Sequence, residues 1–171
     1  MALFLTGCTP SAEKSRDSLQ PAATYEAGLK PPRISFGKNA SRPLVTSWDG
    51  SGRASLVPER IDWKILPELP KATTILVDLD GARPPERVVV QSFGDVDSAG
   101  LPVAEGAEVL CTFADADQCE LRYEPPEILR LKFSDDAVPS EYTTMQMSWL
   151  RLESDEVSEV WATWGMVVRD E

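Results

Sequence analysis

The chain has 171 residues, of which 42% are hydrophobic, so it is long enough to form one domain with a buried core. Its 28 acidic residues outnumber its 17 basic residues, and the formal net charge of −11 repels nucleic acid and anionic lipid surfaces. We therefore expect no nucleic-acid partner, and any attachment to a membrane must come from an apolar or covalent anchor.

The first eight residues contain a candidate for such an anchor. Residues 5–8, Leu-Thr-Gly-Cys, fit the bacterial lipobox, in which the final cysteine carries a thioether-linked lipid. A secretory signal also needs a basic start and roughly 7–15 apolar residues, whereas the segment before Cys8 contains no Lys or Arg. We interpret residues 1–7 as the remnant of a lipoprotein signal peptide and Cys8 as the lipidation site. The alternative is a chance match in a frayed terminus.

The segment 8–32 has the composition of a linker. It has no sustained hydrophobic periodicity and is rich in Ser, Ala, charged residues and proline, with Pro31 and Pro32 at its end. We predict a disordered tether, which would span roughly 25–30 Å on average as a flexible chain. A folded domain over 33–171 would then stand off a membrane surface.

From residue 33 onward, short apolar runs alternate with Pro, Gly and Asp, a pattern that predicts strands. In the clearest of them, Leu129, Leu131 and Phe133 share one face, as do Met145, Met147 and Trp149. These faces are expected to form the core. The predicted strands are 34–36, 44–48, 73–80, 87–93, 108–113, 128–133, 142–152 and 159–169.

Eight short strands without a helix of useful length predict an all-β domain. We expect an immunoglobulin-like antiparallel two-sheet sandwich, with a closed barrel as the structural alternative. The last two strands are expected to pair as a hairpin. Tyr142 resembles the tyrosine of a tyrosine corner, and the region after Trp48 is expected to be an irregular packed loop with a short helical turn at 58–61.

Several of these features together resemble a family of small, uncharacterised Gram-positive surface lipoproteins. They are the lipobox cysteine, the polar linker, the segment Val-Thr-Ser-Trp at 45–48, and the aromatic strand pair that contains Trp149 and Trp161. Many members carry Gly-Thr-Tyr-Ser-Trp near the start of the domain, and this chain departs from that pattern at Leu44 and Val45. The resemblance implies an extracytoplasmic location and a similar fold, and it supplies no catalytic residues.

The cysteines fit an exported protein. If Cys8 carries lipid, Cys111 and Cys119 remain as a pair with seven residues between them. We predict a disulfide across a hairpin, which would contribute roughly 2.5 kcal/mol. The alternative is that Cys111 is a small buried apolar residue.

The sequence predicts no catalytic residues, metal site or cofactor. It contains no His, which removes Ser-His-Asp and Cys-His mechanisms and the commonest zinc ligand. Carboxylates leave a calcium site or a glycosidase-like envelope enzyme as alternatives, although none has EF-hand spacing. The candidate side chains are Asp78, Asp80, Asp95, Asp97, Asp115 and Asp117.

Five tryptophans suggest a second kind of site. Trp48, Trp63 and Trp161 are placed where they could be partly exposed and stack on sugars or on a protein. The alternative is that they fill the core and cover its edges. We therefore expect a noncatalytic binding domain, anchored to the bacterial membrane by lipid on Cys8, with a protein or envelope-glycan partner. The sequence does not predict the oligomeric state.

Overall fold

The computed structural model describes residues 30–49, 58–113, 117–153 and 156–170, and in these ranges it contains eleven strands. Cys8 and most of the predicted tether lie outside the described residues. Within the described ranges, no helix has the length and apolar character needed to cross a membrane.

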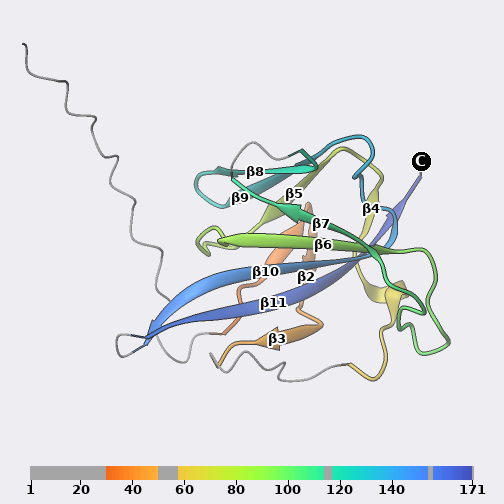
Figure 1. The fold of residues 1–171 in the computed structure, drawn as a ribbon, viewed down its shortest axis with the longest axis horizontal. Helices are drawn as coiled ribbons and strands as arrows, with labels where there is room; N and C mark the ends of the chain where they lie inside the picture. Colours follow the sequence, from red (N-terminus) through yellow and green to blue (C-terminus); the bar gives the residue numbers. More distant parts are fainter. Residues whose placement is uncertain (1–29, 50–57, 114–116, 154–155, 171) are drawn as a thin grey trace, which may run out of the picture.

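Two antiparallel sheets pack together, and the long hairpin of β10 (Glu141–Glu153) and β11 (Glu156–Arg169) runs through one of them (Figure 1). Sheet I has the order β2 (Asn39–Ser41), β1 (Ile34–Phe36), β5 (Thr74–Asp78), β9 (Ile128–Phe133) and β8 (Cys119–Glu124). Sheet II has the order β3 (Val45–Ser47), β11 (Glu156–Arg169), β10 (Glu141–Glu153), β6 (Arg87–Phe93) and β7 (Ala107–Cys111). The short strand β4 (Glu68–Pro70) runs parallel to the end of β11.

The strand order is that of an immunoglobulin domain. In that fold, strands A, B, E and D form one sheet and strands G, F and C form the other, with C′ added in the variable type. With β1 as A, strands β5 to β11 follow in order as B, C, C′, D, E, F and G, which places A-B-E-D in sheet I and G-F-C-C′ in sheet II. The predicted immunoglobulin-like sandwich is therefore confirmed, rather than the closed barrel.

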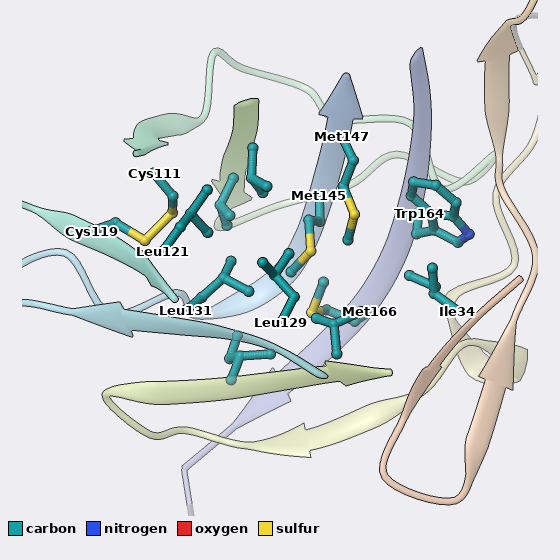
Figure 2. Close-up of a cluster of buried hydrophobic side chains, with 14 of the residues drawn as sticks. Ile34, Cys111, Cys119, Leu121, Leu129, Leu131, Met145, Met147, Trp164 and Met166 are labelled. Carbon is teal, nitrogen blue, oxygen red and sulfur yellow. A yellow bond between two sulfur atoms is a disulfide. The ribbon is translucent and has the colours of Figure 1, made fainter. Parts of the chain in front are cut away.

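The core lies between the sheets because every second side chain of a strand points to the same face. Figure 2 shows the methionines of β10 and β11 between the leucines of sheet I on one side and Trp164 on the other. The Trp149 and Trp164 rings meet edge to face, with centroids 6.4 Å apart. All the predicted core faces are buried, which confirms the alternation read from the sequence. Burying each large side chain contributes roughly 1.5–3 kcal/mol.

Cys111 and Cys119 form a disulfide, as predicted, with their Cα atoms 4.5 Å apart (Figure 2). The expected hairpin is wrong, however. Cys111 ends β7 in sheet II, whereas Cys119 begins β8 in sheet I, and these strands pair with β6 and β9 respectively. The bond therefore ties the edge strands of the two sheets together. Antibody domains place their bridge between strands B and F instead.

The loop that precedes β4 packs against sheet II, but its helical turn lies later than predicted. A 3₁₀ turn, η1, covers Trp63–Ile65, whereas the sequence predicted a turn at 58–61. Asp62 explains the difference because its side chain accepts a hydrogen bond from the backbone N–H of Lys64 (3.2 Å), and a capping carboxylate favours the turn that follows it.

Two further predictions need correction. Strands β2, β4 and β8 are absent from the predicted set. Tyr142 does not form a tyrosine corner: it points to the outer face of β10, whereas Thr143 faces inward and is buried. The Tyr142 ring packs against Trp63 instead, with centroids 5.1 Å apart.

Candidate ligand-binding face

The outward side chains of sheet II form rows across the strands, because the registers of four strand pairs align them. The first row begins at Ser47 and the last ends at Phe93, so the face extends over most of β10 and β11. From one end of the face to the other, the rows are Ser47-Trp161-Ser148-Arg87, Val45-Thr163-Gln146-Val89-Leu110, Gly165-Thr144-Gln91-Glu108 and Val167-Tyr142-Phe93.

A groove of ≈ 320 Å³ lies over the middle rows. We call it the polar groove. Uncharged side chains that can donate and accept hydrogen bonds supply much of its lining: Gln91, Thr144, Gln146 and Thr163. All four are only half-buried, so their polar atoms can reach a ligand.

The charged side chains at the margin of the polar groove are already partnered. Arg87 forms an ion pair with Glu159 (2.9 Å), and the amide nitrogen of Gln91 donates a hydrogen bond to Glu108 (2.8 Å). The second contact orients the Gln91 amide and leaves its oxygen as an acceptor. The polar groove therefore offers a neutral, directional hydrogen-bonding surface rather than a strong net charge.

Trp161 stands beside the polar groove in the first row. Its cross-strand neighbours are Ser148 on β10 and Ser47 on β3, and both serines are buried. The indole is thus the one large side chain among these three positions, and it is half-buried. A partly exposed tryptophan next to uncharged amides and hydroxyls can stack on a flat apolar surface while its neighbours bind polar groups.

The other two predicted tryptophans lie elsewhere, so the structure does not gather the three into one patch. Trp48 packs at the edge of the core, and the centroid of its ring is 5.5 Å from that of the Trp149 ring. Trp63 is 7% exposed, and its indole N–H donates to the carbonyl oxygen of Gly100 (2.7 Å). Of the three, Trp161 is the one that borders the polar groove.

The candidate carboxylates do not converge among the described residues, where no group of three or more His, Cys, Asp or Glu side chains is placed to hold a metal. Asp97 stabilises its own turn by accepting hydrogen bonds from the N–H groups of Ala99 (2.8 Å) and Leu101 (2.9 Å). Asp78 accepts one from the N–H of Asp80 (2.9 Å). Asp95 and Asp117 are exposed, and Asp115 lies outside the described residues.

Comparison of the chain with protein-family models, with curated proteins and with solved structures finds no match. Function is therefore inferred from the geometry of the face itself.

Sequence reasoning missed the lining of the polar groove. Its signal was present in β10, where the outward positions Thr144 and Gln146 are uncharged although the chain is rich in acidic residues. A single uncharged polar residue at an outward position of a strand does not by itself indicate a binding site. They become a site only when the strand register places them beside Gln91 and Thr163.

Proposed function

We propose that this chain is a noncatalytic, lipid-anchored, extracytoplasmic domain that binds a glycan of the bacterial envelope through the outer face of sheet II. The observation that carries the proposal is the polar groove, lined by two glutamines and two threonines with Trp161 at its side. Such a surface suits a ligand that is uncharged, rich in hydroxyl groups and flat on one side, which is the chemistry of a sugar ring.

The side-chain amides favour a particular class of sugar. Gln91 and Gln146 each carry an amide that can donate and accept, and the acetamido group of an N-acetylated hexosamine offers the complementary donor and acceptor. Thr144 and Thr163 add hydroxyl groups that can pair with ring hydroxyls. We therefore commit to a glycan that contains N-acetylhexosamine.

The anchor part of the proposal rests on residues 5–8 and on the cysteine pair. Disulfides persist in oxidising compartments, so the bond between Cys111 and Cys119 supports an extracytoplasmic location. A lipid on Cys8 would then hold the domain at the membrane through the segment 8–32. The chain would meet the envelope glycan from the membrane side.

Isothermal titration of the full chain with a β-1,4-linked N-acetylhexosamine tetramer tests the binding function. We expect saturable binding that Gln146→Ala and Trp161→Thr each weaken. Leu76→Thr is the matched control, because Leu76 is exposed on the outer face of sheet I. No binding, or an equal loss in the control, would contradict the proposal; binding of a protein instead would point to the partner class that the sequence left open.

Mass spectrometry and membrane fractionation test the anchor separately. In the producing cell we expect the mature protein to begin at a lipid-modified Cys8 and to fractionate with the membrane. Cys8→Ser should abolish both the added mass and the membrane association. Identical mass and fractionation for the two forms would rule out the anchor without affecting the glycan site.

A further inference from the structure

A second hollow, of ≈ 550 Å³, lies next to the polar groove on the same side of sheet II. We call it the aromatic groove, because Trp63 and Tyr142 both line it. Its walls come from the loop that contains η1 and from the loop that follows β6. Two hydrogen bonds join these loops: Trp63 Nε1 donates to the carbonyl oxygen of Gly100 (2.7 Å), and the N–H of Ile61 donates to that of Ala99 (2.8 Å).

The contact between the two loops requires glycine at position 100. Gly100 has a φ of +79°, and a Cβ added there would lie 1.9 Å from the carbonyl oxygen of Ile61. Neither the backbone angle nor the space accepts a side chain. The Trp63 ring is thereby fixed against Tyr142, so the aromatic groove is already formed without a ligand.

The aromatic groove carries more exposed charges than the polar groove, and they are of both signs. Its cations are Arg60, Lys64 and Arg169, and its anions are Asp62, Glu68 and Asp97. Arg169 is 4.0 Å from Glu68, whereas Arg60 and Lys64 have no ion-pair partner among the described residues. These two cations can therefore receive a carboxylate, while the anions can receive an amine.

The two grooves meet along β10. Thr144 lines the polar groove and Tyr142 lines the aromatic groove. They occupy successive outward positions of the strand, about 7 Å apart. On β11 the path is blocked instead, since a Cβ at Gly165 would lie 2.7 Å from Leu66 Cδ1 and 3.5 Å from the Trp63 ring. A ligand that occupies both grooves must therefore cross over Thr144 and Tyr142.

We infer that the two grooves form one extended site for a linear glycan that carries a short zwitterionic peptide. This inference rests on the proposed function and adds to it the substituent on the glycan. The N-acetylhexosamine rings occupy the polar groove beside Trp161. The peptide lies in the aromatic groove, with its carboxylate at Arg60 and Lys64 and its amine toward Asp62 and Glu68.

Titration of the full chain with three probes tests the inference. The probes are a β-1,4-linked N-acetylhexosamine tetramer, the same tetramer carrying a short peptide with one free amine and one free carboxylate, and that peptide alone. We expect the substituted tetramer to bind about tenfold more tightly than the bare tetramer, since charge-assisted hydrogen bonds are added. The peptide alone should bind weakly.

Variants separate the two grooves. The double variant Arg60→Ala with Lys64→Ala should remove the tenfold difference and leave binding of the bare tetramer unchanged. Lys132→Ala is the matched control, because Lys132 is an exposed cation on sheet I and should alter neither affinity.

The outcomes distinguish the two claims. Equal affinity for the bare and substituted tetramers, or an equal loss of both in the double variant, would overturn the extended site while the proposed function stands. If the bare tetramer does not bind at all, the proposed function fails and the extended site fails with it.

Discussion

Trp161 on β11 lies directly opposite Ser148 on β10, and the same tryptophan faces Ser47 on its other side. Both serines are buried, and both have side chains much smaller than the indole. Because these serines occupy outward positions and are nevertheless buried, the sheet is covered at this point, while Trp161 itself remains half-exposed. The exposed part of the indole, on the face opposite the core, is the reason to propose Trp161 as a ligand-binding residue.

Replacing Trp161 should therefore separate binding from stability. We expect Trp161→Thr to weaken binding of the N-acetylhexosamine tetramer about tenfold, because a stacking contact contributes roughly 0.5–1.5 kcal/mol beyond the buried area. Thr keeps a residue that suits a strand, so the melting temperature should fall by only a few degrees. Titration and thermal unfolding of the same preparation would check both parts. A loss of stability as large as that of a core variant would assign Trp161 a structural role.

A core variant supplies that comparison. Met147 is completely buried between the sheets, so Met147→Ala should lower the free energy of unfolding by about 2–5 kcal/mol through lost contacts and the cavity left behind. Chemical denaturation would measure the loss. Tetramer affinity, measured well below the unfolding transition, should stay within about twofold of the original. A large change in affinity would mean that the outer face depends on the core packing beneath it.

The disulfide joins the edges of the two sheets and should be important for stability. Replacing Cys111 and Cys119 together by Ala should lower the free energy of unfolding by about 2.5 kcal/mol, the chain-entropy value for so short a loop. Adding a reductant to the unaltered protein should produce a loss of similar size. Denaturation curves with and without reductant would test this. Identical curves for the oxidised protein and the double variant would show that the bond adds nothing.

Gly100 should control the aromatic groove without affecting the polar groove. Gly100→Ala forces a Cβ toward the carbonyl oxygen of Ile61 and strains a positive φ, so the two loops must move apart. We expect the fluorescence of Trp63 to shift toward that of a solvent-exposed indole. Bare-tetramer affinity should remain unchanged. A Trp63→Phe variant gives the emission of the other tryptophans, which is subtracted. An unshifted Trp63 spectrum would contradict the proposed contact between the two loops.

The outer face of sheet I should make stability depend on pH. Arg122 lies opposite Arg130, an unfavourable pairing that is offset by hydrogen bonds from Arg122 to Glu120 and from Arg130 to Glu124. These hydrogen bonds hold the pKa of each glutamate below its usual value of 4.5. Their stabilisation is therefore fully present above that value and is lost as the pH falls through the lowered native pKa values.

Replacing Glu120 and Glu124 by Gln should remove that dependence. We expect the double variant to melt at a lower temperature than the original protein at neutral pH. The difference should shrink as the pH falls below 4.5 and through the lowered native pKa values, because the glutamates of both states then become protonated. Thermal unfolding across this range would measure it. A difference that stays constant with pH would assign the effect to packing rather than to charge.

The alternation of apolar and polar residues predicted most of the sandwich, because a strand that buries one face needs an apolar side chain at every second residue. β9 illustrates this, since its inward positions Leu129, Leu131 and Phe133 are all apolar, and the middle of β10 carries Met145, Met147 and Trp149 in the same way. β8 was missed because only Cys119 and Leu121 are buried among its otherwise polar and charged residues. The short strands β2 (Asn-Ala-Ser) and β4 (Glu-Leu-Pro) were missed because neither carries two apolar side chains on one face, unlike β1 of the same length.

The site was harder to predict than the fold, because it depends on contacts between distant segments. The sequence singled out Trp161 as a candidate, but it could not separate this residue from Trp48 and Trp63. The strand register places Trp161 at an outward position of β11, beside the polar groove. Trp63 is instead buried between two loops, where its indole N–H donates a hydrogen bond to the carbonyl oxygen of Gly100. The location of Cys111 and Cys119 on different sheets depends in the same way on pairings that local sequence does not specify.

The central claim is that the outer face of sheet II binds an N-acetylhexosamine glycan. Titration of the isotope-labelled chain with the tetramer, followed by ¹H–¹⁵N correlation spectra, tests it most directly. The account predicts shifts for the Trp161 indole N–H, for the Gln146 side-chain amide and for the backbone of Thr144 and Thr163, while sheet I signals stay in place. Shifts confined to sheet I, or no shifts at saturating tetramer, would contradict it.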